Sequence, residues 1–176
     1  MHGIATKGIV ESGVTFGRTN LPQYGVAEDD TAVFIFGEID VRCHIAKQAD
    51  QQGVSVDAII ESLATRYGDM IVRNRELYKK CTCIVMEVMP PSDQAFNPSY
   101  PRCGTLEERV VVTRQLNARL KAACGERGIL FFEIHDLLAD PYGILIAELS
   151  DTNVHVSMNH NYLVKQKLVT FLESVQ

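Results

Sequence analysis

The first group of side chains able to do chemistry directly follows an apolar run, which predicts that it lies at the end of a strand. It combines two carboxylates, a guanidinium and an imidazole, and its members are Gly37, Glu38, Asp40, Arg42 and His44. Asp40 or Arg42 could organise a ligand pocket, and Gly37 has no side chain to keep a ligand away from the backbone. A structural interpretation is also open, in which Asp40 caps the next turn and Arg42 pairs with Glu38.

A second candidate site is the pair Asp151 and His155, which stands just before the last expected helix. A histidine acts as a general base when a carboxylate holds its ring in position, as in hydrolytic triads. Both residue types are also common in helix caps and on surfaces. The neighbouring His160 is interpreted as a surface residue at the helix start.

Ser92 belongs to a third candidate segment, because it follows another apolar run and two prolines. This segment could wall a cleft or form an ordinary turn. Cys43, beside His44, is an alternative nucleophile. Neighbouring residues on a strand point to opposite sides, which weighs against this thiol and imidazole working together.

Metal-binding patterns are weak in this sequence. Glu38, Asp40 and His44 are a poor ligand set for a divalent cation if they alternate along a strand end. Cys81 and Cys83 could hold zinc together with a remote histidine, but cysteines in a strand are usually packed side chains. No metal or other cofactor is therefore expected.

Three strands alternating with three long helices would position these groups. The expected strands are 31–36, 83–89 and 129–134, and the expected helices are Ser55 to about 77, Thr105 to about 128, and 161–174. Such alternation predicts a parallel sheet covered on both faces within one domain. Ligands bind beyond the carboxyl ends of the strands in sheets of this kind, where all three candidate segments would meet.

Composition restricts the class of protein. A chain of 176 residues with 46% hydrophobic and 22% charged residues is typical of one globular domain. A net charge of −5 without a basic cluster argues against nucleic-acid binding. Neither a membrane-length apolar stretch nor a secretory signal is visible. Five cysteines without CxxC spacing favour reduced thiols and a cytoplasmic location.

The longest motif is the stretch 36–44, FGEIDVRCH, which resembles the FGEIDCRCH-like motif of a bacterial and viral branch of the SGNH/GDSL hydrolase superfamily. The resemblance covers roughly residues 30–172 and includes further matches in 90–92, 108–120 and 151–155. It implies a three-layer α/β/α, flavodoxin-like sandwich. For active members it also implies ester hydrolysis, often of acyl groups on carbohydrate.

The resemblance also implies roles for individual residues. His155 would be the general base and Asp151 its partner, while Gly37 would match the oxyanion-binding glycine of the family's G-x-N-D block. That block should carry asparagine where this chain has Ile39, so a side-chain donor to the oxyanion is missing. The acid–base block is normally D-x-x-H, whereas Asp151 and His155 stand four residues apart.

A G-D-S nucleophile block is also missing, and Ser12 is the one serine within residues 1–30. We therefore expect residues 1–30 to be an irregular N-terminal segment of the domain formed by 31–176, with the family's first strand lacking. A sheet without that strand would expose an edge or pair with another chain, which is compatible with a homo-oligomer.

Two classes of function follow from this resemblance. The first is an esterase or deacetylase that acts on an acylated carbohydrate or another small ester. The second is a catalytically inert module of the same fold that binds a glycan or a protein partner. The pair Asp151 and His155 favours the hydrolase, whereas the missing serine and asparagine favour the inert module. Neither nucleic acid nor a membrane is expected as a partner.

Overall fold

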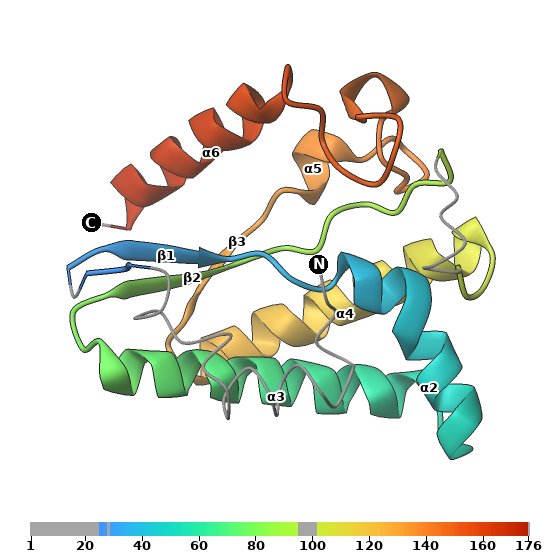
Figure 1. Ribbon diagram of the computed structural model, residues 1–176, viewed down its shortest axis with the longest axis horizontal. Coiled ribbons are helices and arrows are strands. Elements are labelled where there is room, and N and C mark those ends of the chain that lie inside the picture. Colours follow the sequence, from blue (N-terminus) through green and yellow to red (C-terminus); the bar gives the residue numbers. More distant parts are fainter. Residues whose placement is uncertain (1–24, 28, 95–101, 176) are drawn as a thin grey trace.

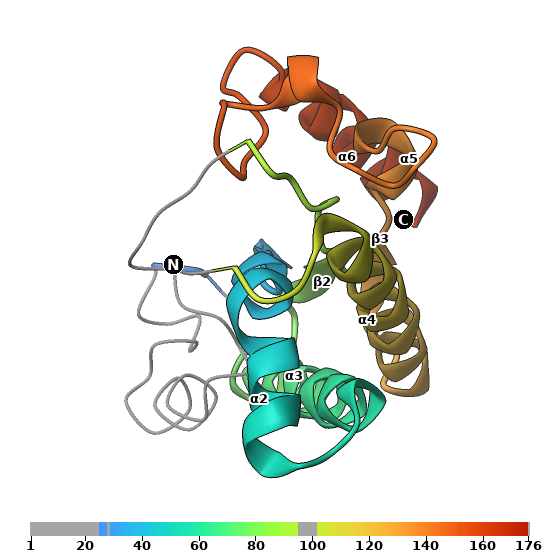
Figure 2. The same cartoon turned by 90° about the vertical axis from the view of Figure 1, so that its right-hand side faces the viewer.

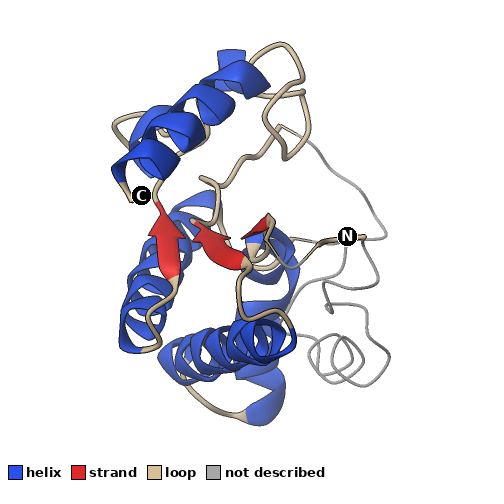
Figure 3. Cartoon of the chain, turned by 90° about the vertical axis from the view of Figure 1, so that its left-hand side faces the viewer, coloured by secondary structure: helices blue, strands red, loops and turns tan. Residues whose placement is uncertain are grey.

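The computed structural model describes residues 25–27, 29–94 and 102–175. At its centre is a parallel three-stranded sheet in the order β1-β2-β3, and helices lie on both sides of it (Figure 3). The strands are β1 (Thr31–Phe34), β2 (Thr82–Met86) and β3 (Leu130–Phe132). The predicted α/β class, with a parallel sheet between helical layers, is confirmed.

Each strand is shorter than the apolar run that predicts it. β1 ends at Phe34, and a helix begins at Glu38 directly after Gly37, which has a φ of 116°. β3 ends because the backbone N–H groups of Ile134 and His135 donate to the carboxylate of Glu87. Ile35 beyond β1 is exposed, but Val88, Ile129 and Ile134 beyond the other strand ends are buried, so composition alone could not mark these boundaries.

Two helical layers enclose the sheet (Figures 1 and 2). Side chains alternate along β2, so that Cys83 and Val85 join one apolar core while Ile84 and Met86 join the other. The first core lies against α2 (Ile45–Gln52), α3 (Val56–Leu77) and α4 (Leu106–Glu126), and the second against α5 (His135–Leu138) and α6 (Asn161–Ser174). A short 3-10 helix, η3 (Ala147–Leu149), precedes α6.

Helix starts follow the capping residues that the sequence predicts. The hydroxyl of Ser55 accepts a hydrogen bond from the N–H of Ala58 at the start of α3. At the start of α4, Thr105 and Glu108 form a reciprocal capping box. The last helix has the predicted bounds, whereas α4 ends at Glu126 rather than at about residue 128.

Residues 38–44 are helical, so the prediction that they form the end of a strand is wrong. Two helical residues follow Gly37 and lead into the π-helix η2 (Asp40–His44), which continues directly into α2. Val41, Ile45 and Ala49 are buried at a spacing of four residues and tie this segment to the core. Glu38 and Arg42 consequently lie one helical turn apart instead of alternating on a strand.

Within the described residues, no helix combines the length and the apolar character needed to cross a membrane. Ser12 and most of the segment 1–30 lie outside the described residues. The boundary between an irregular N-terminal segment and the domain 31–176 therefore stays a prediction.

Candidate active site

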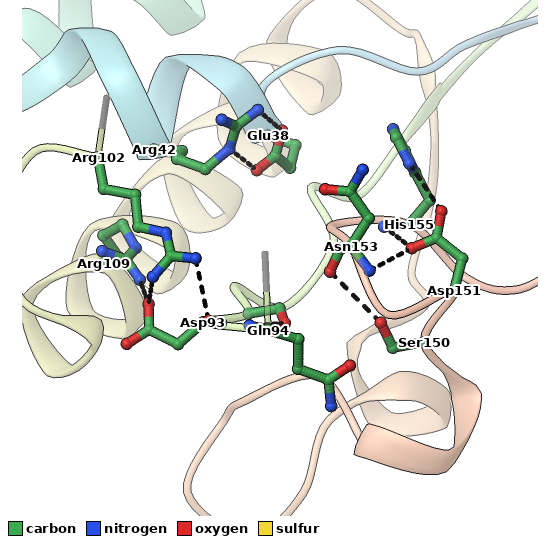
Figure 4. Close-up of polar contacts among 11 residues, drawn as sticks. Glu38, Arg42, Asp93, Gln94, Arg102, Arg109, Ser150, Asp151, Asn153 and His155 are labelled. Carbon is green, nitrogen blue, oxygen red and sulfur yellow. Dashed lines mark hydrogen bonds and ion pairs between the residues drawn. The ribbon is translucent and has the colours of Figure 1, made fainter. Parts of the chain in front are cut away.

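Three segments that follow the strands carry most of the predicted site residues to the carboxyl edge of the sheet (Figures 1 and 4). Glu38 and Arg42 follow β1, Ser92 follows β2, and Asp151 and His155 lie between β3 and α6. This is the edge at which ligands bind in parallel α/β sheets.

The pair Asp151 and His155 forms the contact that a general base requires. Nδ1 of His155 lies 3.2 Å from Oδ2 of Asp151. The histidine side chain is 45% exposed, so its ring is open to a substrate approaching from solvent. Nδ1 can donate to the carboxylate in the tautomer that leaves Nε2 as the proton acceptor. The spacing of four residues is therefore compatible with the orienting contact.

The loop itself fixes the Asp151 carboxylate. Oδ1 of Asp151 accepts hydrogen bonds from the backbone N–H of Asn153 at 2.8 Å and of His155 at 3.2 Å. The backbone N–H of Asp151 donates to the carbonyl of His155 at 3.0 Å, which closes the loop. Thr152 sits between them with a φ of 65°, as a tight turn requires. The orienting group is thus held by backbone geometry rather than by packing alone.

Electrostatics keep Asp151 ionised. Its partial desolvation opposes the charged form, but hydrogen bonds from the backbone of Asn153 and His155 and from the His155 ring outweigh that effect and lower the pKa of Asp151. An ionised carboxylate at this position stabilises the imidazolium that forms when a general base accepts a proton.

Glu38 and Arg42 form a two-point ion pair. Nε and Nη2 of Arg42 donate to the two carboxylate oxygens of Glu38 at 2.7 and 3.1 Å. The pair lines a small pocket together with Ser92 and Arg109, and this pocket has room for about one water molecule. The structural interpretation of Arg42 as the partner of Glu38 is therefore confirmed.

Gly37, Asp40 and His44 do not line this pocket. A Cβ atom at Gly37 would lie 2.5 Å from Cγ2 of Val88, so the absence of a side chain is required by packing. Asp40 is completely buried. His44 is half-buried, and desolvation, with Lys47 and Arg42 nearby, lowers its pKa. The structure thus brings together Glu38, Arg42 and Ser92 but not the other three.

Ser92 is buried, and its hydroxyl accepts a hydrogen bond from the backbone N–H of Gln94. The next residue, Asp93, is held by Arg102 and by the almost completely buried Arg109 (Figure 4). Arg109 also donates to the carbonyl of Gly104. Arg109 therefore positions the loop after β2. From the sequence, Arg109 stands out only as part of the matched stretch 108–120, because its contacts join residues far apart in the chain.

The described residues contain no evident nucleophile. No hydroxyl or thiol within them is hydrogen-bonded to the ring of His155, and Ser150 instead bonds to the backbone of its own loop. Cys43 is buried, and this burial raises the pKa of its thiol, which disfavours the reactive thiolate. Ile39, at which the resemblance implies an asparagine, is also buried.

Metal ligation has no support in the described part of the chain, where no three histidine, cysteine, aspartate or glutamate side chains are grouped to hold an ion. Strand alternation is the reason for which Glu38, Asp40 and His44 are expected to be a poor ligand set. That reason is wrong, because these residues lie on helical turns.

No protein-family model matches the sequence, and no curated protein matches it. Solved structures do match. A protein of Streptococcus pneumonia, provisionally described as a platelet activating factor, has a TM-score of 0.61 and 14% identity. That match covers 81% of this chain and 59% of the other, so this chain spans less than two thirds of its length.

Two structures from Bacteroides match as well. A provisionally described acylhydrolase of Bacteroides fragilis has a TM-score of 0.58 and 18% identity, covering 94% of this chain and 70% of the other. A GDSL-like lipase of Bacteroides thetaiotaomicron has a TM-score of 0.51 and 15% identity, covering 98% and 100%. At sequence identities of 14%, 18% and 15%, the similarity to these three structures shows the fold alone. The chain has the α/β fold of GDSL-like lipases and acylhydrolases.

Proposed function

We propose that this chain is an SGNH/GDSL-type hydrolase domain that cleaves an ester, with His155 as general base and Asp151 as the residue that orients it. The observation that carries the proposal is their 3.2 Å contact at the carboxyl edge of a sheet with the GDSL-like fold. The FGEIDVRCH stretch supports assignment to the branch with the GEIDCRCH-like motif.

The mechanism assigns one proton path to this pair. Nε2 of His155 removes the proton from the hydroxyl group of a nucleophilic residue of the chain as that oxygen bonds to the ester carbonyl carbon. The same proton then passes to the departing alkoxide as the ester C–O bond breaks. Water repeats the sequence on the acyl-enzyme and releases the acid. Asp151 stays ionised throughout and stabilises the imidazolium.

The proposed substrate is an acylated carbohydrate or a similar small ester. Support comes from the motif branch, which is often linked to polysaccharide metabolism, and from the solvent-open position of His155. An exposed base at a loop is accessible to an acyl group on a larger molecule.

A second candidate function is that of an inert binding module with the same fold. The specific observations in its favour are the buried Ile39 in place of an oxyanion donor and the absence of a hydroxyl or thiol bonded to His155 within the described residues. Loss of one oxyanion donor typically lowers the rate about 100- to 1,000-fold, which slows a hydrolase without abolishing its chemistry.

The two functions are distinguished by assaying the full chain against 4-nitrophenyl acetate and an acetylated monosaccharide. We expect turnover that falls about 100- to 10,000-fold in His155→Ala, the range typical of general-base catalysis. His160→Ala is the matched control, since this histidine bonds to Ser157 outside the proposed pair. Turnover unaffected by His155→Ala, or none at all, would contradict the hydrolase proposal, and glycan binding would then be measured.

A further inference from the structure

A larger pocket lies away from the candidate active site and is lined by residues of β3, α5 and α6. It has a volume of about 660 Å³, within the range of small-molecule sites. It shares no lining residue with the pocket at Glu38 and Arg42, and neither Asp151 nor His155 lines it. The proposed hydrolase activity leaves it without a role.

Three phenylalanines contribute to the walls of this β3–α6 pocket. Phe131 and Phe132 come from β3, and Phe171 comes from α6. The rings of Phe132 and Phe171 are tilted against each other, with centroids 5.3 Å apart. Aromatic faces attract both apolar groups and cations.

Glu87 supplies a largely buried carboxylate to this aromatic pocket. Its side chain accepts hydrogen bonds through Oε2 from the backbone N–H groups of Ile134 and His135, both at 2.7 Å. Among the described residues, no group is hydrogen-bonded to Oε1. A carboxylate can accept further bonds, so Glu87 is rigidly held and still able to bind a donor.

The other charges around the pocket are paired. Asp136 bonds to Lys167, and Glu133 bonds to Lys121 at 2.8 Å. Glu87 is therefore the one lining carboxylate without a cationic side-chain partner in the described part of the chain. Because a buried carboxylate is stabilised by a positive partner, the field at the pocket favours a cation over an anion.

His135 provides a second sign of an unmet polar contact. Both of its ring nitrogens are buried and have no hydrogen-bond partner among the described residues. His135 is among the residues that line the same pocket, and its backbone N–H already holds Glu87. An imidazole left unpaired in this way is destabilising, and a donor bound at Glu87 would lie beside it.

We propose that the β3–α6 pocket binds a small organic cation whose aromatic or aliphatic body packs on Phe132 and Phe171 and whose ammonium group bonds to Glu87. The inference does not depend on the hydrolase proposal, since it uses other residues and a binding readout. It explains together an aromatic pocket, an unpaired carboxylate and an unpartnered imidazole.

The test is an amide NMR titration of the full chain with 3-phenylpropylammonium, using 3-phenylpropionate as the probe of similar size and opposite charge. We expect saturable shifts of the Ile134 and His135 amides with a Kd of about 1 mM, a normal affinity for a probe of this size. The carboxylate probe should bind at least about tenfold more weakly because it lacks the charge attraction.

The variant Glu87→Gln tests the contribution of the negative charge without disrupting the fold. A glutamine oxygen can still accept the two backbone hydrogen bonds, so the variant should stay folded while losing about tenfold in affinity for the cation. Glu61→Gln, which removes an exposed carboxylate paired with Arg119, is the matched control and should bind like the unmodified chain. Equal binding of both probes, no saturable shift at these amides, or unchanged affinity in folded Glu87→Gln would each overturn the proposal.

Discussion

At the scale of single residues, the proposed base catalysis depends on how a five-residue loop presents His155. Asp151 bonds to two backbone N–H groups of that loop as well as to the ring, so its position is fixed before any substrate binds. Sequence spacing identified the pair as a candidate. Its geometry could not be predicted, because the left-handed Thr152 that closes the turn is not a residue type associated with that conformation.

We expect Asp151→Asn to lower kcat about 100- to 10,000-fold, because an amide neither selects the required tautomer of His155 nor stabilises the imidazolium. Steady-state kinetics on 4-nitrophenyl acetate measure this effect. Asn153→Ala is a suitable control, since Asn153 contributes to the loop through its backbone N–H and carbonyl. An Asp151→Asn enzyme with normal kcat would remove Asp151 from the mechanism.

The lowered pKa of Asp151 also predicts a pH dependence of stability. A carboxyl group whose pKa is lower in the folded state stabilises the fold above its ordinary pKa of 3.8, and this contribution is lost as the pH falls below that value. Urea unfolding at pH 7, 4.5 and 3 should show a destabilisation by Asp151→Asn that shrinks at pH 3. A difference that instead grows on acidification would contradict the sign of the shift.

At the scale of elements, the sequence predicted helices better than it predicted residues 38–44. Hydroxyl caps at Ser55 and Thr105 mark helix starts through local chemistry. From Glu38 to Cys43, polar and apolar residues alternate, which is the period of a strand. The segment is nevertheless helical, because tertiary packing buries nearly all of its sides and Asp40 with them.

Gly37→Ala tests the junction between β1 and η2. We expect it to lower the free energy of unfolding by about 2–4 kcal/mol, from backbone strain at positive φ together with a clash against Val88. Gly53 has a φ of 63° but open space around an added methyl group, so Gly53→Ala should lower the free energy of unfolding by about 1 kcal/mol. Equal losses in chemical denaturation would show that close packing is not the reason for Gly37.

Asn117 tests how α4 holds the segment after β2. Its side-chain amide accepts from the N–H of Val88 at 2.8 Å and donates to the carbonyl of Val88 at 3.0 Å. Asn117→Ala leaves both buried backbone groups unpaired, and we expect a loss of about 2–4 kcal/mol in urea unfolding. A loss below about 1 kcal/mol would mean that this contact does not anchor the segment.

At the scale of the whole molecule, alternation of strands and helices was enough to predict the layers but not the pockets. The β3–α6 pocket is built from β3, α5, α6 and the residue after β2, so no local pattern indicates it. The bonds of Arg109 to Asp93 and Gly104 likewise join segments that only the fold brings together. Long-range contacts of this kind depend on packing rather than on periodicity.

Burial in the first core predicts the order in which the free cysteines react. Burial raises the pKa of Cys83 to about 12 and of Cys124 to about 11, so both stay protonated and shielded. We expect iodoacetamide at pH 8 to modify the half-buried Cys103 first and to reach Cys83 and Cys124 only after unfolding. Peptide mass spectrometry over time measures the order, and early modification of Cys83 would contradict the packing of β2.

The most direct test of the hydrolase account is labelling of the full chain with a fluorophosphonate, which captures a hydroxyl group activated by a histidine base. We expect one phosphonylated hydroxyl residue, identified by peptide mass spectrometry, with labelling lost in His155→Ala and retained in His160→Ala. No labelling of the unmodified chain, or labelling that persists without His155, would contradict a hydrolase built on the Asp151–His155 pair.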